Sequence, residues 1–534
     1  MTTLPLDSET LLRDLGRPEA YADRPAEVGF LATHISWLFF AGNRVYKLKQ
    51  PVDLGFLDYT TLEQRRHFCE EEVRLNRRMA PDVYLGVVAI TRGEDGRLRV
   101  GGEGTPLEYA VEMERLPAGR MLDALLERGE LDNQMLNDVA ALLARFHGAA
   151  NTGPGVDEHG APAAIRHNVL ENFEQLAPFV GEPGEGQAVL SPAHLEFLKT
   201  RQLGFLDRHA DLLERRVATG RIRDGHGDLH SGNLSFLPEG VIAYDCIEFC
   251  DRFRCGDVAV DLAFLAMDLD MRGFPAFSRY LVRRYAQETR DEELSSLIDF
   301  YKGYRAVVRG KVAAFTALGA EPDTERRAVE LRRAMRYLQL AASYELEPTL
   351  ILMCGLPACG KSYLAEDLAR ALRAVLLHSD TRRKVLAGRR VTDRAAEEVG
   401  AGLYAPEEKD RVYRSLLDDA LATLRSGHSV LVDATFTQRE WRARFVDAAE
   451  RLGLPYHVVH VTAPEAVVLE RLAARATDPN AISDAGEAVY RAARASFEPP
   501  DEVPAGHLVE VESGAGWAEA SSARVLEQRI ARSS

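Results

Sequence analysis

The chain has 534 residues, which is too long for one ordinary hydrophobic core, so we expect at least two domains. Hydrophobic residues make up 46% of the chain and charged residues 28%, and these ordinary globular values exclude a mainly disordered or fibrous protein. The formal net charge of -16 would repel a nucleic-acid backbone, so it disfavours nonspecific nucleic-acid binding.

Neither membrane attachment nor secretion is indicated by the sequence. The start Met1–Asp7 lacks the basic and apolar regions of a signal peptide, and apolar runs such as 350–353 are far shorter than the roughly 20 residues of a membrane span. The six cysteines lack a disulfide-framework spacing, and we interpret Cys246, Cys250 and Cys255 as buried thiols rather than a zinc site. We therefore expect a cytoplasmic protein with reduced thiols.

The first part of the chain predicts a small β lobe followed by a larger helical lobe. Strand-like runs occur at 37–40, 44–49, 83–90 and 109–113, and a helix is predicted over 61–79. From about 120 to 345 the pattern is mainly helical. We expect it to be broken at a Gly/Pro-rich stretch, 153–192, and at a loop-and-strand region, 224–257.

A loop motif in that second region carries the groups that phosphoryl transfer needs. Residues 226–233 read H-G-D-L-H-S-G-N, and an apolar strand that ends in Asp245 follows. Asp228 can orient or deprotonate an acceptor hydroxyl, while Asn233 and Asp245 can hold Mg²⁺. The spacing of the full set predicts a catalytic site.

This set resembles the aminoglycoside phosphotransferase and choline kinase families, over roughly residues 25–345. The resemblance implies an α+β, protein-kinase-like fold for a first domain at 1–345, with its N-lobe at about 25–116 and its helical C-lobe at about 117–345. It also implies that Asp257 braces the catalytic loop. The sequence departs from protein kinases in lacking a G-x-G-x-x-G loop, and only Ala41-Gly42-Asn43 is found in that place.

The kinase arrangement requires an ATP-contacting lysine on the strand after that turn. Lys47 and Lys49 share one face because side chains alternate along a strand, so the period alone does not choose between them. The residue two positions before the lysine should be apolar because it faces the adenine, and Val45 therefore favours Lys47. Among three consecutive glutamates, Glu72 is the expected partner of the lysine, and Met113 lies in the expected adenine hinge.

A second domain is predicted over 349–534, because a long helix stops near 345 and a strand, a glycine-rich turn and a helix follow. Further strand candidates alternate with helical segments, as in parallel βα units. The strand candidates are 349–354, 375–379, 429–433, 457–462 and 507–512.

The glycine-rich turn 355–362 reads G-L-P-A-C-G-K-S and matches the phosphate-loop pattern in the required strand-to-helix context. Gly355 and Gly360 would let backbone N–H groups converge on phosphate oxygens. Lys361 would add a charge at the β and γ phosphates, and Ser362 can ligate Mg²⁺. The loop predicts a second ATP site.

Charged residues end two other strands of this domain. Asp433 ends one strand, where the acidic metal partner of a phosphate loop would lie. Asp380 ends another and is followed by Arg382 and Arg383. The three form either a base beside an anion clamp or a helix cap with a solvated basic turn.

Arg471 and Arg475 lie four residues apart, hence on one face of a predicted helix, and are either lid arginines or part of a solvated face. Together with the preceding motifs they resemble the P-loop small-molecule and polynucleotide kinases, a group that includes gluconate kinases, polynucleotide 5′-kinases and zeta toxins. The resemblance implies an α/β P-loop NTPase domain with a parallel five-stranded sheet. It also implies that Asp380 takes the acceptor proton, that the two arginines after it hold the acceptor, and that Arg471 or Arg475 closes over the transferred phosphoryl group.

The sequence thus predicts a bifunctional kinase that uses ATP and Mg²⁺ and phosphorylates hydroxyl groups of small polar metabolites. One alternative is that one module is catalytic and the other senses ATP and regulates it. Another is that the P-loop module phosphorylates nucleic-acid ends or nucleotide sugars. Two guanidinium groups beside Asp380 favour an acceptor with a phosphate or carboxylate near its hydroxyl.

Overall fold

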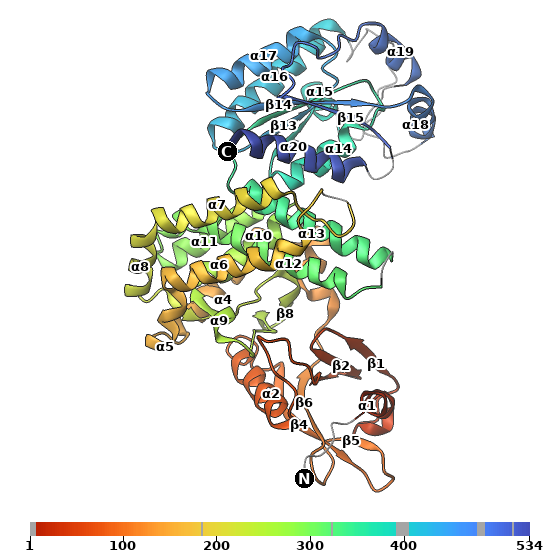
Figure 1. The fold of residues 1–534 in the computed structure, drawn as a ribbon. Coiled ribbons are helices and arrows are strands. Elements are labelled where there is room, and N and C mark those ends of the chain that lie inside the picture. The colour runs from red at the N-terminus through yellow and green to blue at the C-terminus, as the bar shows by residue number, and fades with distance from the viewer. Residues whose placement is uncertain are drawn as a thin grey trace. The chain divides into compact units, whose positions relative to one another are not determined.

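The computed structural model describes residues 7–182, 185–321, 324–390, 405–477, 486–514 and 517–533 (Figure 1). Its chain forms two compact units. Met1–His167, Leu206–Leu269 and Phe274–Tyr301 make up the first, and Asn168–Phe205, Asp270–Gly273 and Lys302–Ser534 make up the second. The predicted domain boundary at 345–349 falls between helix α13 (Glu325–Ser343) and strand β11 (Leu350–Cys354).

The N-lobe is an antiparallel sheet whose described strands pair in the order β1-β2-β3-β6-β4-β5. The strands are β1 (Val28–Ala32), β2 (Ser36–Ala41), β3 (Arg44–Lys49), β4 (Tyr84–Arg92), β5 (Leu98–Val100) and β6 (Glu108–Glu114). The four strand runs predicted from the sequence correspond to β2, β3, β4 and β6, and the predicted helix is α2 (Leu62–Asn76).

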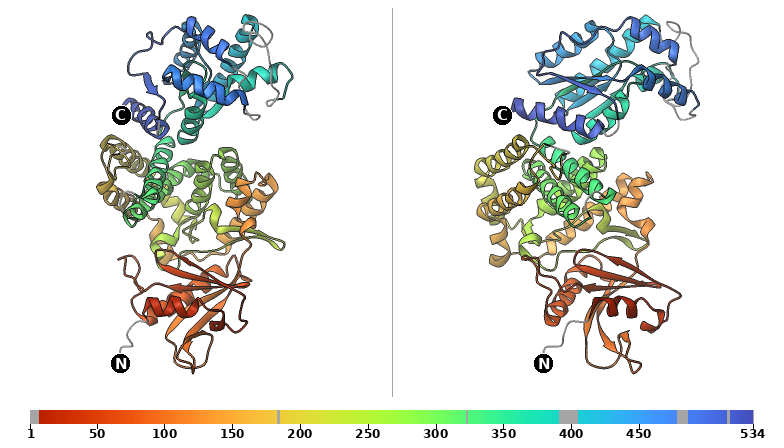
Figure 2. Two further views of the ribbon diagram at one scale, coloured as in Figure 1. Left: turned by 90° about the vertical axis from the view of Figure 1, so that its right-hand side faces the viewer. Right: turned by 45° about the vertical axis from the view of Figure 1, so that its right-hand side comes forward.

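Helices α1 (Ser8–Leu15) and α2 cover opposite faces of this sheet (Figures 1 and 2). The alternation of strand β3 sets this arrangement, because Tyr46 packs with α1 and Val45 packs with α2. A capping box between Thr61 and Gln64 fixes the start of α2, the helix that carries Glu72.

A helical region follows. It contains α3 (Leu122–Glu127), α4 (Asn133–Ala149), α5 (Pro154–Asp157), α6 (Pro162–Leu176), α7 (Pro192–Arg208), α8 (Ala210–Ala218), α9 (Asp251–Arg254), α10 (Val258–Met271), α11 (Pro275–Thr289), α12 (Ile298–Leu318) and α13. The predicted break at 153–192 is partly wrong, because α5 and α6 lie inside it. Pro154 and Pro162 stand at the first position of these helices, where a missing backbone N–H costs nothing, so they start helices there.

Two short antiparallel pairs carry the predicted catalytic loops between these helices. They are β7 (Ile222–Asp224) with β10 (Cys255–Asp257), and β8 (Leu234–Leu237) with β9 (Gly240–Ala243). The H-G-D motif runs between β7 and β8, and Asp245 follows β9. The predicted protein-kinase-like α+β architecture of the first domain is confirmed.

The second sheet is parallel, and its described strands have the order β12-β13-β11-β14-β15. The strands are β11 (Leu350–Cys354), β12 (Val375–His378), β13 (Val430–Asp433), β14 (Tyr456–Thr462) and β15 (Leu508–Glu512). These are the five predicted strands, so the parallel P-loop fold is also confirmed.

Helices cover both faces of the parallel sheet (Figure 1). They are α14 (Lys361–Ala371), α15 (Ser379–Leu386), α16 (Pro406–Arg425), α17 (Arg439–Arg451), α18 (Glu465–Thr477), α19 (Glu487–Ala495) and α20 (Trp517–Ser533). Residues of α16 and α17 form one core with inward-facing side chains of β11, β13 and β14. This face of the three central strands is therefore apolar.

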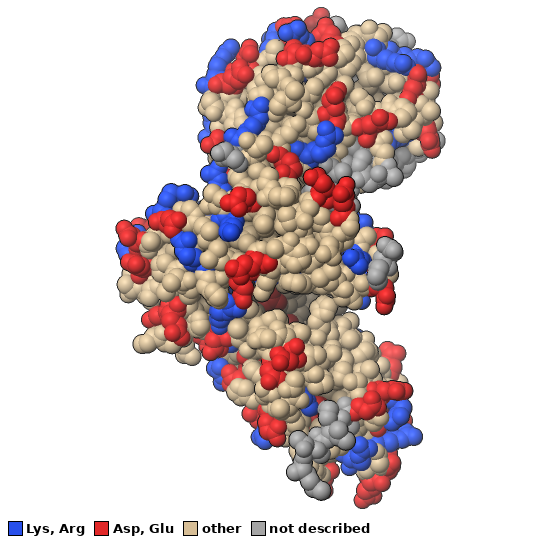
Figure 3. All heavy atoms as spheres, in the orientation of Figure 1, with Lys and Arg blue, Asp and Glu red and all other residues tan. Residues whose placement is uncertain are grey.

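Acidic and basic side chains are interspersed over the face shown in Figure 3. Among the described helices, none is both long and apolar enough to cross a membrane.

Candidate active sites

Lys47 lies at the centre of a charged cluster in the first unit. Its Nζ donates to Glu72 Oε1 at 2.8 Å and to Asp245 Oδ1 at 2.6 Å. Lys49 is completely buried and binds the other oxygen of Glu72 and also Glu248. The structure thus brings the predicted lysine, helix glutamate and metal carboxylate together.

The charge balance of this cluster fits a divalent cation. Three carboxylates face two ammonium groups, which leaves a formal charge of -1. Asp245 is the exposed member, with 44% of its side chain accessible, whereas Glu72 and Glu248 are buried. The surrounding protein would raise the pKa of Asp245, but the charge and hydrogen bond of Lys47 lower it to about 2. A carboxylate that stays ionised and faces solvent is a suitable ligand for Mg²⁺.

Hydrogen bonds hold the H-G-D loop in place around Asp228. The Asp228 N–H donates to His226 Nδ1 at 3.2 Å, and the Asn233 amide nitrogen donates to the Asp228 carbonyl at 3.0 Å. Because its nitrogen is used in this bond, Asn233 has its amide oxygen left to bind a metal. Gly227 has φ +84° and its Cβ would lie 2.9 Å from a backbone oxygen of Phe253, so the motif requires glycine there.

Asp261, rather than the predicted Asp257, braces this loop. The Asp261 carboxylate accepts the N–H groups of His226 and Gly227 at 2.7 and 2.9 Å. Asp257 instead forms a two-pronged ion pair with Arg216 at the start of α10. The prediction was wrong by one helical turn, because both aspartates fit the sequence pattern and only packing distinguishes them.

The expected adenine hinge lies in an apolar environment. Met113 pairs with Val45 across β3 and β6, and both belong to one hydrophobic cluster. Ile242 of β9 packs against the same cluster from the catalytic loops. Apolar side chains from the sheet and from the loop region therefore meet where the resemblance expects a purine ring.

Replacing Lys47 and Lys49 separately should give different defects. We expect Lys47→Met to weaken ATP use more than Lys49→Met, because Lys47 reaches Asp245 and is 12% exposed, whereas Lys49 is buried. Lys49→Met should mainly destabilise the fold by about 3–5 kcal/mol, because it leaves Glu248 without its buried charge partner. ATP titrations and thermal unfolding of both variants check this. The reverse order of nucleotide defects would assign the phosphate contact to Lys49.

The phosphate loop of the second unit has the expected geometry. Gly355 has φ +142°, and its Cβ would lie 2.3 Å from the Val461 oxygen, so a larger residue would displace the loop. Helix α14 begins at Lys361, whose Nζ donates to the Leu356 carbonyl at 2.7 Å. The N-terminus of this helix faces the loop, as an anion site requires.

The predicted metal pair of this loop is in contact. Ser362 Oγ donates to Asp433 Oδ2 at 2.6 Å, and His378 Nδ1 lies 3.1 Å from the same oxygen. Burial would raise the pKa of Asp433, but the hydrogen bond from His378, the charge of Lys361 and the hydrogen bond from Ser362 lower it. The ionised carboxylate and the hydroxyl oxygen beside it fit Mg²⁺. Sequence reasoning missed His378, although its place at the end of β12 was a usable signal.

The acceptor residues predicted at the start of α15 are placed differently from one another. Arg383 binds Asp380 Oδ1 at 2.6 Å, so this guanidinium lies beside the predicted base. Arg382 pairs with Asp419 of α16. The role of Arg383 beside Asp380 is therefore better supported than an acceptor role for Arg382.

Lys409 is a nearby cation that sequence reasoning missed. Its Nζ lies 3.4 Å from Thr437 Oγ1 and 3.3 Å from Gln438 Oε1, in the loop after β13. Within the described part of the chain Lys409 forms no ion pair. Burial lowers the pKa of its ammonium group; the charge of Asp410 raises that pKa and the charge of Arg383 lowers it, and the net shift is downward. A partly buried cation next to a second cation favours an anion at this place.

Of the two predicted lid arginines, Arg471 is hydrogen-bonded to the phosphate loop. It donates to Ser513 Oγ at 2.9 Å and to the Ala358 carbonyl at 3.4 Å. Arg475 is partly exposed in the last turn of α18. The segment 478–485 after this helix lies outside the described residues.

Comparison with known proteins matches each unit's catalytic elements to a family. Residues 58–296 match the phosphotransferase enzyme family, and residues 350–500 match the family described as AAA domain. Uncharacterized protein Rv2004c of Mycobacterium tuberculosis is 32% identical over 453 residues, which cover 83% of this chain and 85% of that protein. The chain belongs to the same family as this mycobacterial protein, and its two matched domains make it a kinase.

Two solved structures are similar to parts of this chain. A gluconokinase from Sinorhizobium meliloti is 18% identical and covers 35% of this chain and 94% of its own, with a TM-score of 0.25. A choline/ethanolamine kinase family protein from Mesorhizobium loti is 11% identical and covers 59% of this chain and 88% of its own, with a TM-score of 0.35.

Proposed function

We propose that each module of this kinase transfers the γ-phosphoryl group of ATP, with Mg²⁺, to a hydroxyl group of a small polar metabolite. The observation that carries the proposal is that both units combine the same three parts. Each has a lysine for the phosphates, an ionised carboxylate with a candidate second oxygen ligand, and a separate carboxylate that can serve as base. A module that only sensed ATP would not need the base.

We propose the bounds 1–345 for the first module and the following roles for its residues. Lys47 would orient the phosphates while Glu72 holds its side chain. Asn233 and Asp245 would bind Mg²⁺, which neutralises charge on the phosphoryl oxygens. Asp228 would accept the proton of the acceptor hydroxyl, and Asp261 fixes its loop through two backbone hydrogen bonds.

In the second module, with proposed bounds 349–534, the backbone from Gly355 to Gly360 and Lys361 would hold the phosphates. Ser362 and Asp433 would hold Mg²⁺, and Arg471 would face the transferred group. Asp380 would act as base at the carboxyl edge of the sheet, where ligands of parallel α/β sheets bind.

We further propose that the acceptor of the second module is anionic. Arg383 beside the base and the partly buried Lys409, whose ammonium group donates to Thr437 and Gln438, support this, because two cations near one another favour an anionic ligand. The acceptor should therefore carry a carboxylate or phosphate near its reacting hydroxyl.

Charge-matched acceptors test this prediction. We expect the full-length protein to phosphorylate hydroxy acids such as gluconate better than neutral polyols such as sorbitol. Arg383→Met and Lys409→Met should each raise the KM of the acid about tenfold or more, because hydrogen bonds to charged groups contribute about 1.5–3 kcal/mol. Arg414→Met, on the exposed face of α16, is the matched control. Equal use of both acceptor classes by the wild type would exclude an anionic acceptor.

A further inference from the structure

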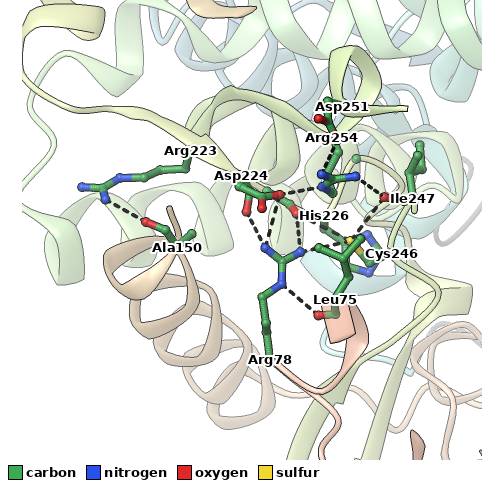
Figure 4. A network of polar contacts seen from close by, with 12 residues as sticks. Leu75, Arg78, Ala150, Arg223, Asp224, His226, Cys246, Ile247, Asp251 and Arg254 are labelled. Carbon is green, nitrogen blue, oxygen red and sulfur yellow. Dashed lines mark hydrogen bonds and ion pairs between the residues drawn. The ribbon is translucent and has the colours of Figure 1, made fainter. Parts of the chain in front are cut away.

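Arg78 joins the end of helix α2 to both catalytic loops of the first module (Figure 4). It lies two residues beyond α2 and is anchored by its Nε, which donates to the Leu75 carbonyl at 2.8 Å. Its two terminal nitrogens donate to the carbonyls of Asp224 and Gly225 at 2.7 and 2.8 Å. One of them also lies 3.2 Å from the Cys246 sulfur. These partners flank His226 on one loop and Asp245 on the other.

Only an arginine can make this set of contacts from one position. The guanidinium group is a planar fork with five donors, so it can bind two adjacent carbonyls and still be anchored to its own helix. The fork also stacks over Phe146, with 4.9 Å between its carbon and the ring centre. The contacts are therefore directional and not a solvated surface charge.

Asn76, in the last turn of α2, provides a second connection. Its side chain is 1% exposed, its nitrogen donates to the Glu72 carbonyl at 2.9 Å, and its oxygen accepts the Cys246 N–H at 2.9 Å. Two hydrogen bonds thus link the residue that pairs with Lys47 to the neighbour of Asp245. The Lys47–Glu72 ion pair is therefore linked to Asp245 in two ways. One is the direct Lys47–Asp245 contact, and the other runs through the Asn76 side chain to the backbone of Cys246.

We propose that Arg78 and Asn76 are positioning residues that hold Glu72, Asp228 and Asp245 in one catalytic arrangement. The proposal rests on the function proposed for the first module. A displacement of about 1 Å in such an arrangement can cost about a hundredfold in rate.

The test uses full-length protein carrying Lys361→Met, so that ATP turnover reports the first module. We expect Arg78→Met to lower kcat about a hundredfold while the affinity for the ATP analogue AMP-PNP changes less than tenfold. Arg78→Lys should be intermediate, because a single ammonium group cannot bind both carbonyls. Arg74→Met is the control, since Arg74 lies on the exposed side of α2 and pairs with Glu71. Asn76→Ala should resemble Arg78→Met.

Amide hydrogen exchange provides a readout that does not depend on turnover. In Arg78→Met, residues 62–76 should exchange faster while the parallel sheet of the second unit is unchanged. A kcat within threefold of the Arg74→Met control, a kcat defect that disappears when cooling restores the folded fraction, or unchanged exchange in 62–76 would overturn the proposal. If the Lys361→Met protein neither binds AMP-PNP nor turns over ATP, the activity proposed for the first module is refuted. Faster exchange of residues 62–76 in its Arg78→Met variant would still support the structural link between α2 and the two loops.

Discussion

Asp228→Asn should lower the rate of phosphoryl transfer by the first module by about 10² to 10⁴, which is the usual contribution of a positioned general base. The asparagine keeps the size of the side chain, and the loop is held by backbone bonds to His226, Asn233 and Asp261 that do not involve the Asp228 carboxylate. The variant should therefore fold normally and lose the proton acceptor, together with the contact of the carboxylate to His230 at 3.7 Å. Its affinity for AMP-PNP should stay within about threefold of the wild type.

The measurement is ATP-dependent labelling of a metabolite extract by full-length protein in the Lys361→Met background. Glu239→Gln is the matched control, because Glu239 is an exposed carboxylate in the hairpin between β8 and β9. If Asp228→Asn turns over as fast as this control, Asp228 is not the base. If AMP-PNP affinity falls together with the rate, the substitution has disturbed the loop and His226→Gln should reproduce the effect.

The phosphate loop, the H-G-D loop and all five parallel strands could be predicted because each is encoded by consecutive residues. A phosphate loop needs glycines at fixed positions to bring backbone N–H groups together, so its eight-residue sequence motif is enough to predict phosphate binding. The alternation of strand β3 placed Lys47 and Lys49 on one face and did not choose between them. The apolar residue at Val45 then favoured Lys47, the lysine that contacts Asp245 in the structure.

The positioning groups could not be predicted because they join segments that are far apart in the sequence. Lys49 and Glu248 are 199 residues apart, and Arg78 and Asp224 are 146 residues apart. Their side chains look like ordinary surface charges until the fold buries them. Asp257 and Asp261 show the limit of local patterns, since only the packing of α10 against the loop decides which carboxylate accepts the two backbone N–H groups.

Sequence reasoning also treated Arg382 and Arg383 as an equivalent pair. Neighbouring residues of a helix point about 100° apart, so both cannot face one ligand from α15. In the structure Arg383 turns to Asp380 and Arg382 turns to Asp419. Lys409, from a helix that begins 26 residues after Asp380, is the second cation near Arg383.

Lys361→Met should strongly weaken nucleotide binding to the second module and leave the first module unaffected. Lys361 is the cation of the phosphate loop, and loss of a hydrogen bond to a charged group costs about 1.5–3 kcal/mol, or roughly 10- to 150-fold in affinity. Loop shape should be retained, because it depends on the glycines and on the Ser362–Asp433 contact. Arg370→Gln, on the exposed side of α14, is the control.

Calorimetric titration of full-length protein with AMP-PNP and Mg²⁺ checks this prediction. We expect two binding events in the wild type, one in Lys361→Met and none when Lys47→Met is added. Two retained events in Lys361→Met would refute the assignment of the loop. The affinity of the remaining site decides between the two functions weighed for this kinase. An unchanged affinity indicates two independent catalytic modules. A changed affinity indicates a coupling free energy between the sites, since binding at one site can alter the other only through such a term, and it would favour the second module as an ATP sensor.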